Sequence, residues 1–111
     1  MIKFKDLSQE PPFVLLKDKY DEALSKNQRN IEAISISSYK KDTDEVDSRY
    51  VNLKVINGKD FIFFSNYNSQ KSKQFQSNNN IAALCFWNNI NTQIRLKAKI
   101  FRLDESLSDS Y

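Results

Sequence analysis

The chain has 111 residues, of which 40% are hydrophobic and 28% are charged, and its formal net charge is +3. This length holds one small hydrophobic core and the composition is that of a globular protein, so we expect residues 1–111 to form a single domain. The absence of histidine excludes His-based catalytic triads and the usual zinc sites, and the single glycine excludes a glycine-rich phosphate loop.

The start of the chain predicts an amphipathic helix and no export signal. Met1–Lys5 leads directly into polar sequence, and no apolar stretch approaches the ~20 residues that span a bilayer, so we expect a cytoplasmic protein. Pro11 and Pro12 suit the first turn of a helix. Apolar residues then recur at helical spacing up to the break at Asn27–Asn30. These residues are Phe13, Leu16, Tyr20, Ala23 and Leu24.

The middle of the chain predicts three antiparallel strands. Ile31–Ser38 is rich in β-branched residues and places Ile34 and Ile36 on one face. A charged hairpin loop at 40–47 leads to a strand at 48–55, in which Val51, Leu53 and Val55 alternate with Tyr50, Asn52 and Lys54. Asn57-Gly58 predicts a two-residue type I′ turn, and the strand at 61–65 returns from it.

The last third predicts a short inserted helix and two more strands. Ser69 caps the helix at 70–77. The apolar run at 81–87 is typical of a central strand with both faces covered, which makes Cys85 a buried and inert thiol. The strand at 92–103 alternates between apolar and basic residues, and residues 104–111 resemble the start of another helix. Five strands with two helices indicate a mostly β fold, a small β-barrel with added helices.

Two groups of residues suggest an anion site. Arg49 and Lys54, at opposite ends of one strand, are either solvated edge charges or a phosphate site built from a forked and a mobile donor. The polar segment at 66–73, which includes Lys71, is either a capped helix start with exposed lysines or a second phosphate contact.

A third group is basic. Its members are Gln93, Arg95, Lys97 and Lys99. They form either the exposed side of an amphipathic strand or, with Phe86, Trp87 and Phe101, a groove for single-stranded nucleic acid. A net charge of only +3 argues against nucleic-acid binding as the main function.

Several runs of the sequence carry a more specific signal. They are SRYVNLK (48–54), FIFFSNYNSQKSK (61–73), AALCFW (82–87), NTQIRL (91–96) and SDSY (108–111). In this order and register they resemble the pyridoxamine 5′-phosphate oxidase family, and the resemblance extends from Pro12 to Tyr111 almost without gaps. It implies an antiparallel FMN-binding split barrel, normally a homodimer with FMN at the subunit interface.

The resemblance also implies a reaction and its site. The reaction is oxidation of pyridoxamine or pyridoxine 5′-phosphate to pyridoxal 5′-phosphate, with FMN taking the hydride and molecular oxygen reoxidising it; no nucleic acid or membrane takes part. Arg49 would grip the FMN phosphate, Lys54 would also face the substrate, and Tyr111 matches a tyrosine at the substrate phosphate. The implied FMN contacts are Arg49, Tyr50, Val51, Asn52, Leu53, Lys54, Phe64, Ser65, Gln70, Lys71 and Gln93. No catalytic side chain and no metal ligand is implied.

The sequence departs from the family pattern at three places. Gln70 stands where the family usually has an arginine, and Phe64 stands where tyrosine is common. The C-terminal substrate-site portion of the family has no counterpart before the chain ends at Tyr111. Two other functions therefore stay open: a noncatalytic FMN-binding split-barrel relative, and a small barrel that binds single-stranded nucleic acid. A yellow purified protein with a flavin spectrum would exclude the second.

Overall fold

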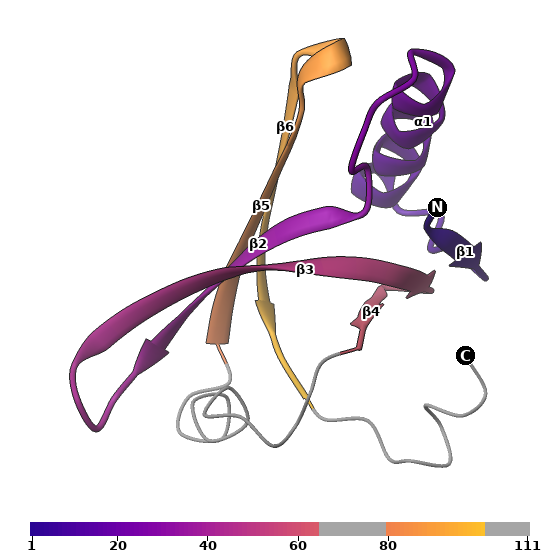
Figure 1. The fold of residues 1–111 in the computed structure, drawn as a ribbon. Helices are drawn as coiled ribbons and strands as arrows, with labels where there is room; N and C mark the ends of the chain where they lie inside the picture. The colour runs from indigo at the N-terminus through magenta and orange to yellow at the C-terminus, as the bar shows by residue number, and fades with distance from the viewer. Residues whose placement is uncertain (65–79, 102–111) are drawn as a thin grey trace.

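A computed structural model describes residues 1–64 and 80–101 of the chain (Figure 1). These residues form a mostly β structure with one α-helix and one short 3₁₀ turn. In chain order the elements are β1 (Lys3–Lys5), α1 (Pro11–Ser25), β2 (Ala33–Lys40), β3 (Glu45–Asn57), β4 (Asp60–Phe63), β5 (Asn80–Trp87), η1 (Asn88–Ile90) and β6 (Thr92–Lys99). None of the described helices is long and apolar enough to cross a bilayer.

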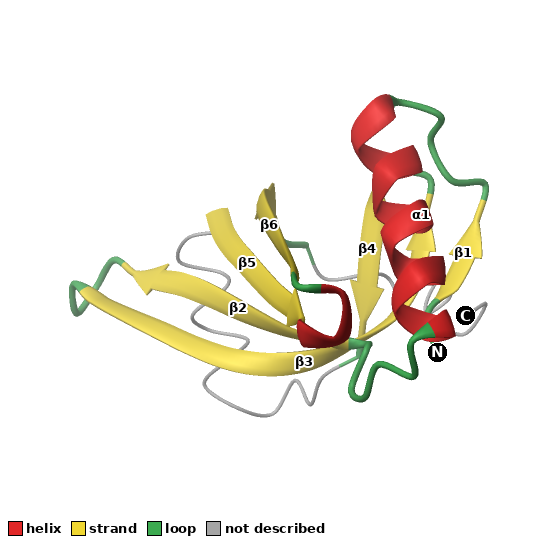
Figure 2. Cartoon of the chain, turned by 90° about the horizontal axis from the view of Figure 1, so that it is seen from above, coloured by secondary structure: helices red, strands yellow, loops and turns green. Residues whose placement is uncertain are grey.

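The long strand β3 organises the sheet. Its first half pairs antiparallel with β2, and its second half pairs with β4 and, in parallel, with β1. Strands β5 and β6 extend the sheet beyond β2, so the strand order is β1-β3-β2-β5-β6. The β2–β3 hairpin projects as an arm at one end of the molecule, while α1 lies beside β1 and β4 at the other end (Figures 1 and 2).

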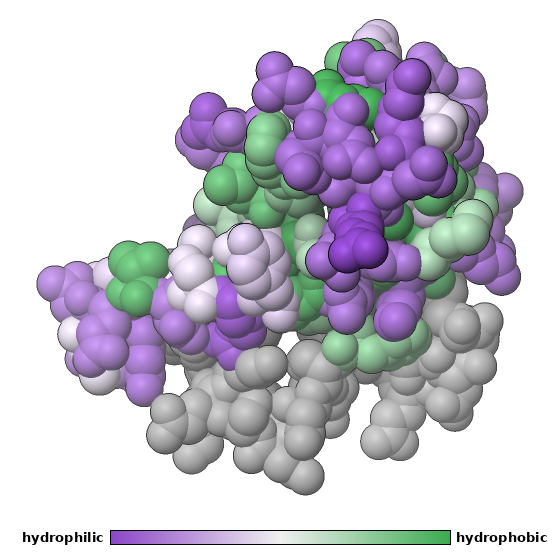
Figure 3. Space-filling model, turned by 45° about the horizontal axis from the view of Figure 1, so that its top comes forward, coloured by the Kyte–Doolittle hydropathy of each residue, from purple (hydrophilic) through white to green (hydrophobic). Residues whose placement is uncertain are grey.

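Helix α1 covers the core with one face. Pro11 occupies its first turn, where the missing N–H has no helical partner to lose. Tyr20 and Ala23 are the buried residues of the helix. Its outer face carries i,i+4 and i,i+3 ion pairs of Lys17 with Asp21 and of Lys19 with Glu22. Hydrophilic side chains accordingly dominate the helical end of the molecule in Figure 3.

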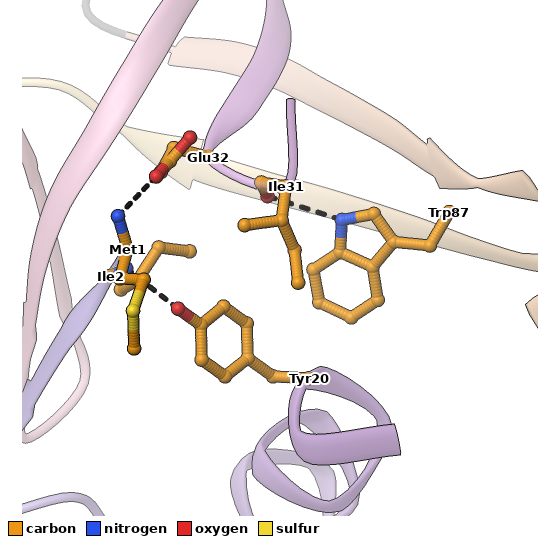
Figure 4. A network of polar contacts seen from close by, with 6 residues as sticks. All are labelled: Met1, Ile2, Tyr20, Ile31, Glu32 and Trp87. Carbon is orange, nitrogen blue, oxygen red and sulfur yellow. Dashed lines mark hydrogen bonds and ion pairs between the residues drawn. The ribbon is translucent and has the colours of Figure 1, made fainter. Parts of the chain in front are cut away.

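A polar network ties the first residues to the core (Figure 4). The hydroxyl of Tyr20 accepts a hydrogen bond of 2.7 Å from the backbone N–H of Ile2. The Met1 ammonium pairs with the carboxylate of Glu32. The indole N–H of Trp87 donates to the carbonyl of Ile31 at 3.2 Å. Together these contacts connect β1, α1, β5 and the segment that enters β2.

The predicted β2–β3 loop is too long. The strands continue to the Lys40–Glu45 pair, because the ladder extends through residues that sequence composition alone marks as loop. The remaining turn is closed by a hydrogen bond of 2.6 Å from the Tyr39 hydroxyl to Asp44, which adopts a left-handed backbone with φ 54°. Asp47 therefore lies in a strand, not in a loop.

The turn after β3 is a hairpin as predicted, but it is not of type I′. Asn57 pairs with Asp60, so the two turn residues are Gly58 and Lys59. Of these two, only Gly58 has a positive φ, at 62°, whereas type I′ needs two such residues.

Three further expectations need correction. The sheet is not wholly antiparallel, because β1, too short to show a periodicity, pairs in parallel with β3. Strand β5 is central as predicted, but its outer face is not covered by the described residues: Leu84 is 45% and Phe86 is 56% exposed. Strand β6 ends at Lys99. The predicted helices at 70–77 and 104–111 lie outside the described residues.

Candidate functional site

Strand β3 places the residues at 49–54 on its two faces in strict alternation. Val51 and Leu53 are buried in the core, at 8% and 6% exposure, so a ligand could reach them only through their backbone. Tyr50, Asn52 and Lys54 are exposed on the opposite face. This alternation confirms the predicted facing of the strand, and it has a consequence for the site. Arg49 and Lys54 lie about 17 Å apart along β3 and point to opposite faces.

Arg49 already holds an anionic oxygen. Its side chain is only 14% exposed, and its Nη2 lies 3.0 Å from Oδ2 of Asp47, two residues earlier on the same face of β3. A guanidinium donates to carboxylate and phosphate oxygens in similar geometry. The donor set at Arg49 therefore suits a phosphate group.

The outer face of the sheet combines apolar and basic side chains. One row across the strands runs from Tyr50 through Ser35 and Leu84 to Arg95. A second row runs from Ser48 through Ser37 and Ala82 to Lys97. In this second row the hydroxyls of Ser37 and Ser48 are 2.6 Å apart.

Gln93 belongs to the same outer face. It lies opposite Phe86 on β6, which is separated from β3 by β2 and β5. Three strand spacings amount to about 14 Å, so Gln93 and the exposed residues of β3 border a broad face rather than a tight pocket. Phe64, 48% exposed, follows directly after β4. Ser65, Gln70, Lys71 and Tyr111 lie outside the described residues.

Charges near Lys54 also shape this region. The pKa of Glu32 is lowered, mainly by its hydrogen bond with the Met1 ammonium and, to a smaller extent, by the positive charge of Lys54. A carboxylate that stays ionised therefore lies near Lys54. An anion that binds Lys54 would therefore also be repelled by the negative charge of Glu32.

The core contains a cavity that is too small for a cofactor. This cavity of about 10 Å³ is lined by apolar side chains, among them Ile34, Leu53 and Trp87, and is at the lower limit of size for a single water molecule. Cys85 is buried beside it, and burial raises the pKa of its thiol to about 11. This confirms an inert thiol, since a nucleophilic cysteine needs a lowered pKa. Within residues 1–64 and 80–101, a ligand as large as a flavin would therefore have to bind at surface positions.

Sequence reasoning missed Asp47 and the exposure of Leu84 and Phe86. The charged composition of residues 40–47 predicts a loop at Asp47, although its place two residues before Arg49 would put both side chains on one face of a longer strand. The apolar run at 81–87 carries no periodicity that could reveal an uncovered face.

Several known proteins are similar to this chain over most of its length. No protein-family model matches the chain. A pyridoxine/pyridoxamine 5′-phosphate oxidase of Hydrogenovibrio crunogenus is 34% identical over 93% of this chain, which covers 47% of that protein. The chloroplastic pyridoxine/pyridoxamine 5′-phosphate oxidase 1 of Arabidopsis thaliana is 33% identical over 90% of this chain and 19% of its own length.

This chain is similar in sequence to the pyridoxine/pyridoxamine 5′-phosphate oxidases. The oxidase of Neisseria gonorrhoeae agrees, with 41% identity over 58% of the chain and 30% of that protein. The resemblance stated from the sequence motifs is thereby confirmed. The chain spans about half the length, or less, of the oxidases it matches.

A solved structure confirms the fold. PhzG from Burkholderia lata, crystallised with tetrahydrophenazine-1-carboxylic acid, superposes with a TM-score of 0.82 over 89% of this chain and 48% of its own. The two sequences are 23% identical. The mostly β split-barrel fold is therefore shared.

Proposed function

We propose that this oxidase relative binds FMN and catalyses the oxidation of pyridoxamine or pyridoxine 5′-phosphate to pyridoxal 5′-phosphate. The observation that carries the proposal is the 34% identity over 93% of the chain to a protein of that name. The chain spans 47% of that relative.

The cofactor site is proposed at β3 and the segments around it. The Arg49 guanidinium, which holds a carboxylate oxygen at 3.0 Å, would hold the FMN phosphate. Lys54 would face the substrate as well as the cofactor, and Tyr111 its phosphate. The other proposed FMN contacts are Tyr50, Val51, Asn52, Leu53, Phe64, Ser65, Gln70, Lys71 and Gln93. When bound, FMN supplies a hydride acceptor that molecular oxygen reoxidises to give hydrogen peroxide. The protein binds and orients the cofactor and the substrate.

A second copy of the chain is the proposed partner of the outer face. Tyr50 on β3 and Leu84 and Phe86 on β5 are 76%, 45% and 56% exposed. These apolar side chains lie on the same face of the sheet as the basic side chains of β6. Contiguous exposed apolar surface marks interaction sites. We therefore propose a homodimer of single-domain chains, and we expect it in the cytoplasm.

Titration with FMN tests the phosphate site. Arg49→Ala should weaken FMN binding by about 1.5–3 kcal/mol, the range for a hydrogen bond to a charged group. Arg49→Lys should restore only part of this loss, because the forked geometry is absent. Arg29→Ala removes the same charge from an exposed loop position and serves as the matched control.

Two outcomes decide the proposal. Equal FMN affinity of the wild type and Arg49→Ala would contradict the phosphate site. A turnover assay with pyridoxamine 5′-phosphate and oxygen then separates an oxidase from a noncatalytic FMN-binding relative, because only the oxidase forms pyridoxal 5′-phosphate.

A further inference from the structure

The Arg49–Asp47 pair is an ion pair at the proposed phosphate site. Both residues belong to β3 and point to the same face, and they pair with Ile36 and Ser38 of β2. The Arg49 side chain is 14% exposed, whereas the Asp47 side chain is 54% exposed. The Arg49 side chain is thus largely covered by its surroundings, whereas the Asp47 side chain is open to solvent.

A phosphate would meet the same guanidinium that Asp47 contacts at 3.0 Å. A phosphate monoester carries a charge of about −1.5 to −2 at neutral pH, so it repels a carboxylate at the same donor group. Two unit charges ~4 Å apart interact in water by about 1 kcal/mol, or about fivefold in an equilibrium constant. Asp47 is therefore costly for phosphate binding whether it stays at Arg49 or is displaced.

We propose that Asp47 is a built-in competitor for the phosphate group at Arg49, and that it lowers the affinity of the chain for phosphate-bearing flavin. This inference rests on the proposed function of Arg49 and adds a specificity-determining residue to it. Asp47 acts on the strength of phosphate binding and takes no part in the redox step.

The test compares FMN with riboflavin, which lacks the phosphate, by quenching of flavin fluorescence. Asp47→Asn keeps an oxygen that can accept from Arg49 but removes the charge. It should tighten FMN binding about five- to thirtyfold at low salt and leave riboflavin binding unchanged. The gain should shrink as salt rises, because the repulsion that is removed is partly screened. Asp47→Glu keeps the charge and should bind FMN with nearly wild-type affinity.

Asp42→Asn is the matched control, since it makes the same charge change at an exposed turn position of the hairpin arm. An equal gain in this variant, or an equal gain for riboflavin, would overturn the inference. So would unchanged or weaker FMN binding in Asp47→Asn, provided that Arg49→Ala does weaken it. The increase in FMN affinity caused by Asp47→Asn should be smaller when Arg49 is already replaced by alanine. An undiminished increase would show that Asp47 repels the phosphate at a distance and does not compete for Arg49.

The proposed function fails in a different way. If Arg49→Ala leaves FMN affinity unchanged, the phosphate does not bind at Arg49, whatever Asp47→Asn does. Thermal unfolding of Asp47→Asn should match the wild type to within about 1 kcal/mol, because the Asp47 side of the ion pair is open to solvent and Asn still offers Arg49 an acceptor oxygen. This measurement separates a binding effect from a folding defect.

Discussion

Replacing Tyr20 with phenylalanine tests the polar network at the start of the chain. Tyr20 is 2% exposed and its hydroxyl accepts the Ile2 N–H at 2.7 Å. Phenylalanine keeps the ring, which lies 4.9 Å from the Phe4 ring and 6.0 Å from the Trp87 ring between centroids. The variant therefore removes one acceptor from a buried backbone donor and little else. The expected loss in the free energy of unfolding is about 1–3 kcal/mol.

Urea and thermal unfolding measure this loss. The urea midpoint should fall without a change in the m-value, because the surface exposed on unfolding stays the same. The melting temperature should fall by roughly 4 °C for each kcal/mol in a chain of this length. Tyr39→Phe is the matched control: its hydroxyl donates to Asp44 at the exposed hairpin, so its stability should change by less than about 0.5 kcal/mol.

Alkaline pH provides a second measurement on the same variant. Burial, the largest cause, raises the pKa of Tyr20 above its ordinary value of 10.0. The folded chain then keeps a proton that the unfolded chain loses, so the wild-type stability contributed by Tyr20 decreases as the pH rises above 10.0. Tyr20→Phe should lack this part of the decrease. Equal stability losses in Tyr20→Phe and Tyr39→Phe, or none in Tyr20→Phe, would refute the reasoning.

Two further predictions concern strand β5. The pKa of the Cys85 thiol is raised from 9.0 to about 11, so the wild type should lose about 2–3 kcal/mol of stability as the pH rises through this range, and Cys85→Ala should show a flatter profile in pH-dependent urea unfolding. Leu84→Asp places a charge on the outer face and should convert the proposed dimer to a monomer at micromolar concentration in sedimentation experiments. Leu15→Asp, which alters a similarly exposed leucine on α1, should leave the dimer intact, and dissociation in both variants would contradict the proposed interface.

Local patterns in the sequence were sufficient to predict much of the fold. The period of 3.6 in the apolar residues predicted α1, and the two proline residues its start. The period of two at 48–55 predicted which side chains of β3 are buried. Glycine at 58 predicted a turn, because a positive φ costs glycine little. Each of these features depends on residues that are close together in the sequence.

The family resemblance supplied what local patterns could not. It named the residues at 49–54 as a cofactor site, although their pattern alone fits an edge strand with two cations. The structure then placed Arg49 and Lys54 on opposite faces of β3, a separation that follows from the alternation itself. The sequence spacing therefore suggested one anion site that contains both cations, whereas in the structure Arg49 and Lys54 lie on different faces of the sheet.

The remaining features depend on contacts between distant segments, and only the tertiary structure decided them. The three residues of β1 become a strand only because β3 offers a partner edge. The outer face of β5 differs from its inner face because α1 and the core lie on one side of the sheet, a fact that the uniform apolar run at 81–87 does not encode. Asp47 meets Arg49 because the β2–β3 ladder extends to the Lys40–Glu45 pair. Periodicity reports how a segment alternates, whereas burial and pairing depend on which other segments pack against it.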